Sequence, residues 1–296
     1  MNAPPFPLNP TVGQRFGQWV WNGGRWVCSP ATGVQVIIQT FTASGPYMPS
    51  PGLVTAVVEC WGAGGAGGGV GEPSSNEALG GSGGGSGGYS KKALAAALVA
   101  GGVQVTIGVG GAYGPNSGKA PDGTATSFGA LCVANGGIGG WAMFPSVSDP
   151  EPGGGAPPGV GDVASPGATG APGYWLVFTA PQTNYSSATQ LGGQINGGNA
   201  GLMLGANNGF AGPSGAPNSG AGGAGATANQ LSAPTSFAGG GGGSGLCVVT
   251  EYCWMDVVPD DCTDTVNMNA RVTVDGRGGW SGAPYVDHRG GEFGDD

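Results

Sequence analysis

The chain has 296 residues, of which 68 are glycine and 24 are proline, and only 8% are charged. Its length suits one large domain or two small ones. The net charge of −9 excludes the basic footprint of a nucleic-acid-binding protein. Apolar residues make up 39% of the chain and gather in short β-rich runs, which argues against a disordered chain.

The first ten residues, MNAPPFPLNP, lack the basic and apolar segments of a secretory signal, and no apolar run is long enough to span a membrane. We therefore expect synthesis in a cytosol and no membrane insertion. No CxxC pair is present, and several cysteines lie in apolar runs, so we expect all six to be reduced and structural. They are Cys28, Cys60, Cys132, Cys247, Cys253 and Cys262.

A β-hairpin module is predicted at the N-terminus, over residues 1–33. Residues 17–27, GQWVWNGGRWV, are two alternating segments around an Asn-Gly-Gly turn, a strong hairpin signal because such turns need positive φ. Trp21 and Trp26 are expected to face each other across it. The tryptophans of this hairpin either dock onto another protein or cover the chain's own core: they are Trp19, Trp21 and Trp26.

Six further segments have the β-branched, breaker-bounded composition of strands. They are residues 34–42, 53–61, 102–109, 127–134, 174–179 and 246–253. Only residues 91–99, KKALAAALV, have helix-forming composition, and because this segment is short, a strand is nearly as plausible there.

Two long insertions, residues 136–173 and 192–245, are rich in glycine, alanine, serine, proline and asparagine. Their glycines alternate with apolar residues, unlike those of a flexible linker. We predict that they form polyproline-II helices that pack side by side, because the missing Cβ lets backbones approach and form weak Cα–H···O contacts. A collagen triple helix is excluded because glycine at every third position holds only briefly, as in residues 167–173.

No catalytic, cofactor or metal site is predicted. The single histidine, His288, lies in a charged, glycine-rich stretch that is typical of a solvated tail. Around Lys119 the phosphate-loop pattern GxxxxGK fails at Tyr113 and Ala120. The acidic residues from Asp256 onward lack the ligand pattern of a calcium loop.

Recognition is the chemistry that remains. Aromatic residues lie in or beside the insertions, among amides and serines, and such aromatics suit stacking on sugars or on a protein epitope. The competing interpretation is that they fill the cores of their own insertions. The candidate receptor-binding residues are Trp141, Phe144, Tyr174, Trp175, Tyr185 and Phe210.

The order of strand-like blocks and glycine runs over about Val36 to Cys253 resembles the glycine-rich domain of bacteriophage tail-fibre and adhesin proteins. The blocks include LVTAVVECWGAGGAGGG, GGSGGYSKKAL and GGGGSGLCVVTEYC, and the order is more specific than any single run. The resemblance implies an all-β, jelly-roll-like sandwich beside packed glycine helices. It carries no fixed binding positions over to this chain, and the N-terminal module is similar to short modules that attach phage fibres to the virion.

Together these features predict a glycine-rich β domain over residues 34–255 and a C-terminal extension over 256–296. The strand-like residues 270–280 of that extension are expected to help assembly with a neighbouring subunit. The expected function is a non-enzymatic virion fibre protein that attaches to other virion proteins through its N-terminal region. It binds a host-surface glycan or outer-membrane protein, as a homotrimer. The alternative is a structural virion component without a specific receptor; a depolymerase would need paired carboxylates, which are scarce here.

Overall fold

The computed structural model describes residues 7, 9–16, 19–24, 26–28, 31–74, 76–145, 151–177, 186–188, 204–206, 209–229 and 235–257. The chain divides into two compact units. Residues 36–253 form one unit, and residues 1–35 with 254–296 form the other.

Nearly all regular structure is β, which confirms the predicted all-β class; its jelly-roll connectivity stays a prediction. The elements are β1 (Arg15–Phe16), β2 (Trp19–Trp21), β3 (Trp26–Cys28), β4 (Ala31–Phe41), β5 (Gly45–Tyr47), β6 (Leu53–Trp61), β7 (Glu77–Gly80), β8 (Tyr89–Ala95), α1 (Ala96–Val99), β9 (Val103–Thr106), β10 (Thr126–Phe128), β11 (Cys132–Ala134), β12 (Val163–Ser165), β13 (Tyr174–Val177), β14 (Ser186–Ala188), β15 (Leu204–Ala206), β16 (Thr227–Asn229) and β17 (Leu246–Val257).

The predicted N-terminal hairpin is present. Strands β2 and β3 pair antiparallel with Trp21 opposite Trp26, and β1 adds to the other side of β2. The turn uses a positive φ of 100° at Gly23, and the Gly24 N–H donates to Asn22 Oδ1 over 3.0 Å. The alternation of this short segment was therefore sufficient to predict its register.

Two antiparallel sheets pack face to face in the larger unit. One has the strand order β12-β8-β6-β17-β4 and the other the order β11-β10-β9-β5. Buried apolar residues from both sheets meet in one core between them. That core contains Tyr47, Ala56, Val58, Cys60, Leu94, Val99, Val105, Ile107, Phe128, Cys132, Ala134, Cys247 and Val249.

Two predicted segments differ in detail. Residues 127–134, predicted as one strand, are two strands, β10 and β11, joined by a turn in which Gly129 has a φ of +53°. Apolar residues continue through that turn, from Phe128 to the run ALCVA at 130–134, so the sequence does not mark the break. Residues 91–99 combine both expected structures, because β8 ends at Ala95 and one helical turn, α1, follows it.

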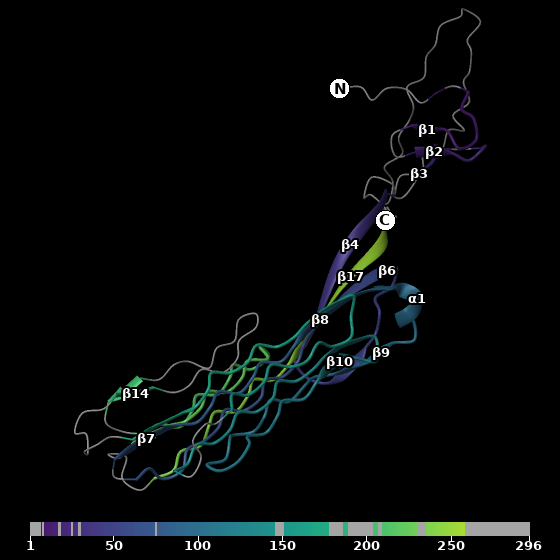
Figure 1. Ribbon diagram of the computed structural model, residues 1–296. Coiled ribbons are helices and arrows are strands. Elements are labelled where there is room, and N and C mark those ends of the chain that lie inside the picture. Colours follow the sequence, from purple (N-terminus) through teal and green to yellow (C-terminus); the bar gives the residue numbers. More distant parts are fainter. Residues whose placement is uncertain are drawn as a thin grey trace, which may run out of the picture. The chain divides into compact units, whose positions relative to one another are not determined.

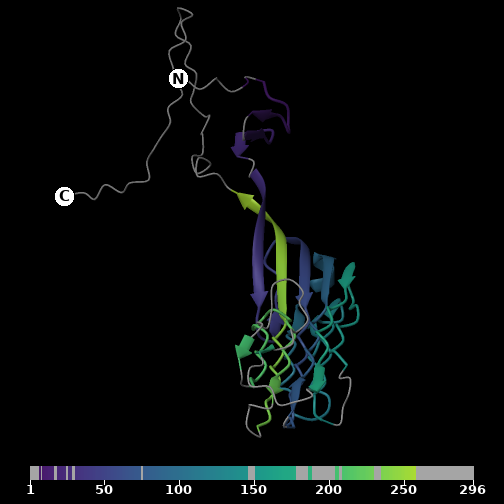
Figure 2. The same cartoon turned by 60° about the vertical axis from the view of Figure 1, so that its left-hand side comes forward.

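Extended glycine-rich segments continue the strands of the sandwich. Figures 1 and 2 show them running side by side from the sheets to the end of this unit that carries β7. Residues 62–71 continue β6, residues 135–144 continue β11, and residues 82–88 and 237–245 lead into β8 and β17. We call this assembly the glycine bundle. Its segments thus start from a register that the sheets have already set.

Residues 62–71 lie at the centre of the glycine bundle. From Gly62 to Val70, successive backbone N–H groups donate in turn to three neighbouring segments, and each neighbour receives every third one; the Gly71 N–H donates to Met143. Gly62, Gly65 and Gly68 donate to residues 82–88, over 2.8–2.9 Å. The next two series of donors end on residues 115–124 and 237–243. A repeat of three is that of the polyproline-II helix, whose backbone groups have no internal partners.

Three more segments donate to the carbonyl groups of the same central residues: they are residues 108–114, 137–143 and 221–226. The central backbone therefore has partners on all sides, as a buried backbone requires. This confirms the predicted side-by-side packing of the glycine runs. The bonds differ from those predicted, because conventional N–H···O bonds replace the expected Cα–H···O contacts as the main link.

Close approach explains the glycines. A Cβ built on Gly67 would lie 2.1 Å from the carbonyl oxygen of Ala224, and one built on Gly64 would lie 1.9 Å from that of Ala221. Neither glycine has a positive φ, so backbone conformation is not the reason for its presence. The missing side chain is what lets neighbouring backbones reach hydrogen-bonding distance.

A small apolar cluster closes the far end of the glycine bundle. Val70, Met143 and Ala226 end their glycine segments there and pack with Leu79 and Ala228. The strands β13, β7 and β16 form a three-stranded sheet at the same end. We call this cluster and its sheet the distal cap. The bundle is therefore held between two apolar cores, the sandwich and the distal cap.

One carboxylate is fully buried in the sandwich. Glu251 Oε1 accepts hydrogen bonds from Tyr47 Oη at 2.6 Å and Ser50 N at 3.1 Å, while Oε2 accepts from Ser50 Oγ at 2.6 Å. Burial alone would raise the pKa of Glu251, but the hydrogen bonds from Ser50 and Tyr47 outweigh it and lower that pKa. Burial and the bond to Glu251 raise the pKa of Tyr47. The pair is therefore a carboxylate and a neutral phenol.

The four cysteines whose side chains are described are buried and free, as predicted. Cys60 and Cys247 lie opposite each other on β6 and β17, with their sulfurs 3.7 Å apart. Burial and hydrogen bonding among these thiols keep Cys60 protonated by raising its pKa, with its bonds to Cys132 and Cys247 as the largest causes. The side chain of Cys28 and all of Cys262 lie outside the described residues.

Substituting Gly67 with alanine tests the close packing. The added Cβ meets backbone on a central segment, so we expect the free energy of unfolding to fall by about 3 kcal/mol, the upper range for an overpacked core. Gly45→Ala is the control, because a Cβ there meets nothing within 4 Å, and its effect should stay within about 0.5 kcal/mol. Denaturant unfolding measures both. Equal effects of the two substitutions would contradict the packing.

Glu251 makes stability depend on pH. Its folded-state pKa lies below the ordinary 4.5, so its contribution is present above about pH 4.5 and is lost as the pH falls through the lowered value. We expect Glu251→Gln to be about 2 kcal/mol less stable at pH 7, because charged hydrogen bonds are lost, and to lose less stability on acidification. Unfolding curves between pH 7 and pH 3 measure this, with the exposed Glu72→Gln as control. A parallel pH profile of Glu251→Gln and the wild type would refute it.

Candidate recognition surface

One outer segment of the glycine bundle displays large apolar side chains at a spacing of three. Residues 138–144, IGGWAMF, place Ile138, Trp141 and Phe144 at successive turns, and we call these three residues the ridge. Ile138 and Trp141 are 37% and 40% exposed and Phe144 is half-buried, whereas the residues between them are buried. A polyproline-II helix rises 3.1 Å per residue, so neighbouring ridge residues repeat about every 9 Å.

The ridge is held by backbone contacts on its inner sides. The Trp141 N–H donates to Ser82 Oγ at 2.7 Å, and the Ser82 N–H donates back to the Trp141 carbonyl at 3.0 Å. Ser82 is fully buried, and its hydroxyl also donates to the Glu151 carbonyl. The backbone of Trp141 is therefore fixed by buried Ser82, while the Trp141 side chain remains partly exposed to solvent.

An ion pair lies beside the ridge. Lys119 is paired with Trp141 through an isolated antiparallel bridge, and Lys119 Nζ lies 2.7 Å from Asp122 Oδ1. The Gly139 N–H donates to the same Oδ1 at 2.7 Å. Burial opposes the charged form of Asp122, but the bonds from Lys119 and Gly139 outweigh it, so the pKa of Asp122 is lowered.

This geometry combines three features of a recognition surface. Trp141 offers a partly exposed apolar ring, Asp122 offers acceptor oxygens, and Lys119 offers a donor. The Lys119 and Asp122 side chains are 38% and 51% exposed, so both reach solvent. A ring beside fixed polar groups suits a ligand with an apolar face and hydroxyl groups at its rim, which is the surface of a sugar ring.

The other predicted receptor-binding residues lie elsewhere. Tyr174 and Trp175, on β13, belong to the distal cap: the Tyr174 ring covers Gly80, where a Cβ would lie 2.2 Å from it, and Trp175 packs on the apolar cluster. Phe210 is half-buried and pairs with Thr227. Tyr185 lies outside the described residues. The structure thus places Trp141 and Phe144 on the ridge, whereas Tyr174 and Trp175 belong to the distal cap.

The predicted docking tryptophans are only partly described. Trp19 and Trp21 are half-buried on β2, and the side chain of Trp26 lies outside the described residues. Trp19 lies opposite Cys28, and Trp21 lies opposite Trp26. Docking through this hairpin therefore stays a prediction.

Some features of the surface were not predicted from the sequence. Ile138 was not singled out, although NGGIGGWAMF carries a large residue at every third position. Lys119 was considered only as part of a failed phosphate loop, and Asp122 was not considered. The signal that links Lys119 to Asp122 is their separation by three residues, one turn of a polyproline-II helix.

Within the described part of the chain, no group of three or more histidine, cysteine or acidic side chains lies close enough to hold a metal ion. No described helix is both long and apolar enough to cross a membrane. His288 and the acidic residues after Val257 lie outside the described residues, so those predictions are not tested.

Comparison with known families gives a match over most of the chain. The family model described as "Glycine-rich domain" matches residues 42–252, a range that covers the glycine bundle, the distal cap and the sandwich apart from β4 and the end of β17. A comparison with curated proteins found no match. The match supports the glycine-rich part of the predicted resemblance.

Proposed function

The chain belongs to the glycine-rich domain family, and from that premise we propose that it is a non-enzymatic bacteriophage fibre protein that binds a glycan on the host surface. The observation that carries the proposal is the partly exposed Trp141 ring beside the Lys119–Asp122 pair. In this proposal the glycine bundle is the rigid support that displays the ridge. The hairpin with Trp19 and Trp21 attaches the protein to other virion components.

A glycan fits the ridge better than a flat protein epitope does. The apolar groups form a line instead of a broad patch, and charged groups flank the line directly. Protein interfaces usually place several aromatic or apolar anchors in a wide, dry centre. A linear row with polar neighbours suits an extended polymer of sugar rings, in which several weak contacts add up.

A structural role without a receptor is the second candidate. It is favoured by the positions of Tyr174 and Trp175, which contribute to the distal cap instead of standing open to solvent. In that case the glycine bundle would serve only as a robust exposed element of the virion.

Substitution of Trp141 separates the two candidates. We expect labelled wild-type protein to bind saturably to one or more polysaccharides on an array of bacterial surface polysaccharides. It should also bind bacterial cells whose surface carries one of those polysaccharides. Trp141→Ala should weaken this binding at least about tenfold, which corresponds to about 1.4 kcal/mol. Tyr113→Ala is the matched control, because Tyr113 is 72% exposed and lies outside the ridge. It should bind as the wild type does.

Circular dichroism and the melting temperature establish that each variant is folded. Asp122→Asn should also weaken binding while preserving the fold, because it removes charge from an exposed group. Absence of saturable binding by folded wild-type protein would reject the adhesin and leave the structural role. Binding that Trp141→Ala and Asp122→Asn both retain would place the receptor site elsewhere.

A further inference from the structure

The sheets of the described chain end in edge strands of very unequal length. The edge strands β5, β11, β12, β13 and β16 have four residues or fewer. Strand β4, at one edge of the five-stranded sheet, has eleven. A long edge strand presents a row of unpaired backbone N–H and C=O groups, and short edges are one way in which proteins avoid pairing with other chains.

Strand β4 also lacks two other devices that protect an edge, charged residues and proline. Its sequence, ATGVQVIIQTF, has no charged residue and no proline. Val36 and Ile38 are 53% and 64% exposed, and Thr40, the next residue on that face, is exposed as well. Residues 36–41 belong to the same unit as the rest of the sheet. An exposed apolar row on an uncharged edge strand is a site for strand pairing.

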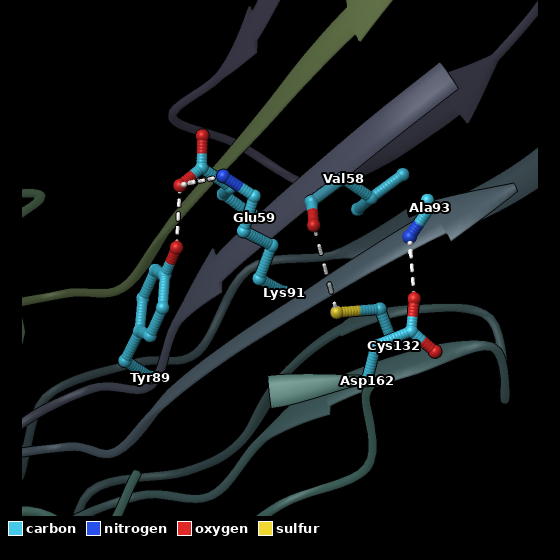
Figure 3. A network of polar contacts seen from close by, with 7 residues as sticks. All are labelled: Val58, Glu59, Tyr89, Lys91, Ala93, Cys132 and Asp162. Carbon is cyan, nitrogen blue, oxygen red and sulfur yellow. Dashed lines mark hydrogen bonds and ion pairs between the residues drawn. The ribbon is translucent and has the colours of Figure 1, made fainter. Parts of the chain in front are cut away.

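The opposite side of the same sheet is protected by polar groups (Figure 3). On β8, the Ala93 N–H donates to Asp162 Oδ2 at 2.9 Å, next to the short edge strand β12. Lys91 Nζ lies 3.7 Å from Glu59, which also accepts a hydrogen bond from Tyr89. Asp162, directly before β12, and Lys91, on the neighbouring strand β8, place charged side chains on that side of the sheet, whereas β4 has no charged residue. The two edges differ in the way that pairing through β4 requires.

We propose that β4 pairs antiparallel with β4 of a second copy of this chain, about a twofold axis. An occupant of the edge must supply an extended strand with an open edge and alternating apolar side chains, and within the described residues β4 itself is the long strand with those properties. Each copy carries a net charge of −9, so two copies repel each other, and an uncharged edge is where they approach at least cost.

The pairing would give the edge of each copy backbone hydrogen bonds and apolar neighbours. Antiparallel strands would exchange backbone hydrogen bonds, and Val36 and Ile38 of the two copies would become cross-strand neighbours on one face. An interface of this kind is the same patch on both subunits, as a closed twofold dimer requires. This inference does not depend on glycan binding, and it differs from the trimer that the resemblance to phage fibres implies.

The mass of the full-length protein in solution tests the proposal. Light scattering after size exclusion should give 57 kDa, twice the 28.5 kDa of one chain. Ile38→Lys should give 28.5 kDa, because it places a charged side chain among the apolar residues of the paired edges. Val109→Lys is the matched control: Val109 is 68% exposed and lies outside the sheets, so this variant should remain a dimer.

A milder variant, Ile38→Thr, distinguishes loss of pairing from loss of folding. Ile38→Thr keeps a β-branched residue in the strand and should weaken the dimer while circular dichroism stays that of the wild type. Added salt should strengthen the wild-type dimer, because it screens repulsion between the two acidic copies. A monomeric or trimeric wild type would overturn the proposal. So would a dimer that both Ile38→Lys and Ile38→Thr leave intact.

Discussion

The structure depends on one contact, the backbone hydrogen bond between glycine-rich segments that lack a Cβ at the point of approach. At Gly67 and Gly64 a neighbouring carbonyl occupies the position that a side chain would take. Because a polyproline-II helix leaves its N–H and C=O groups free, each segment can bond to neighbours on all sides. The segments of the glycine bundle are therefore ordered and packed against one another, and they are not independent loops.

Hydrogen bonds alone do not hold such a bundle together. Ordering the backbone of one residue costs about 1–2 kcal/mol, and one hydrogen bond returns a net of about 1 kcal/mol. The apolar core of the sandwich and the distal cap around Val70 and Met143 supply burial at both ends. The segments between them start in register from the strands, so they gain close packing once the two ends have formed.

The sequence predicted those elements that depend only on a short-range pattern of residues. Strand β6 was predicted from β-branched composition between breakers, and the hairpin with Trp21 opposite Trp26 from alternation and turn residues. The break between β10 and β11 was missed, because apolar residues continue across the turn at Gly129. The neighbours of each glycine segment could not be predicted either, because all segments have nearly the same composition and a glycine carries no side chain to specify its partner.

The same reasoning applies to the candidate site. Trp141 and Phe144 were identified as candidates from composition. Their separation by three residues is the spacing that places both on the ridge. The place of Tyr174 and Trp175 in the distal cap depends on the pairing of β13 with β7, and the contact of Trp141 with Lys119 depends on packing between two outer segments. Both are tertiary facts that no local pattern encodes.

Amide hydrogen exchange of the glycine run at residues 62–71 tests the central claim most directly. Every one of these N–H groups donates to a neighbouring segment in the buried centre of the bundle, so the run should exchange as slowly as strand β17, which has a neighbouring strand on each side. Exchange at the rate of an unstructured chain, while β17 remains protected, would show that the glycine segments are not packed and would contradict this account.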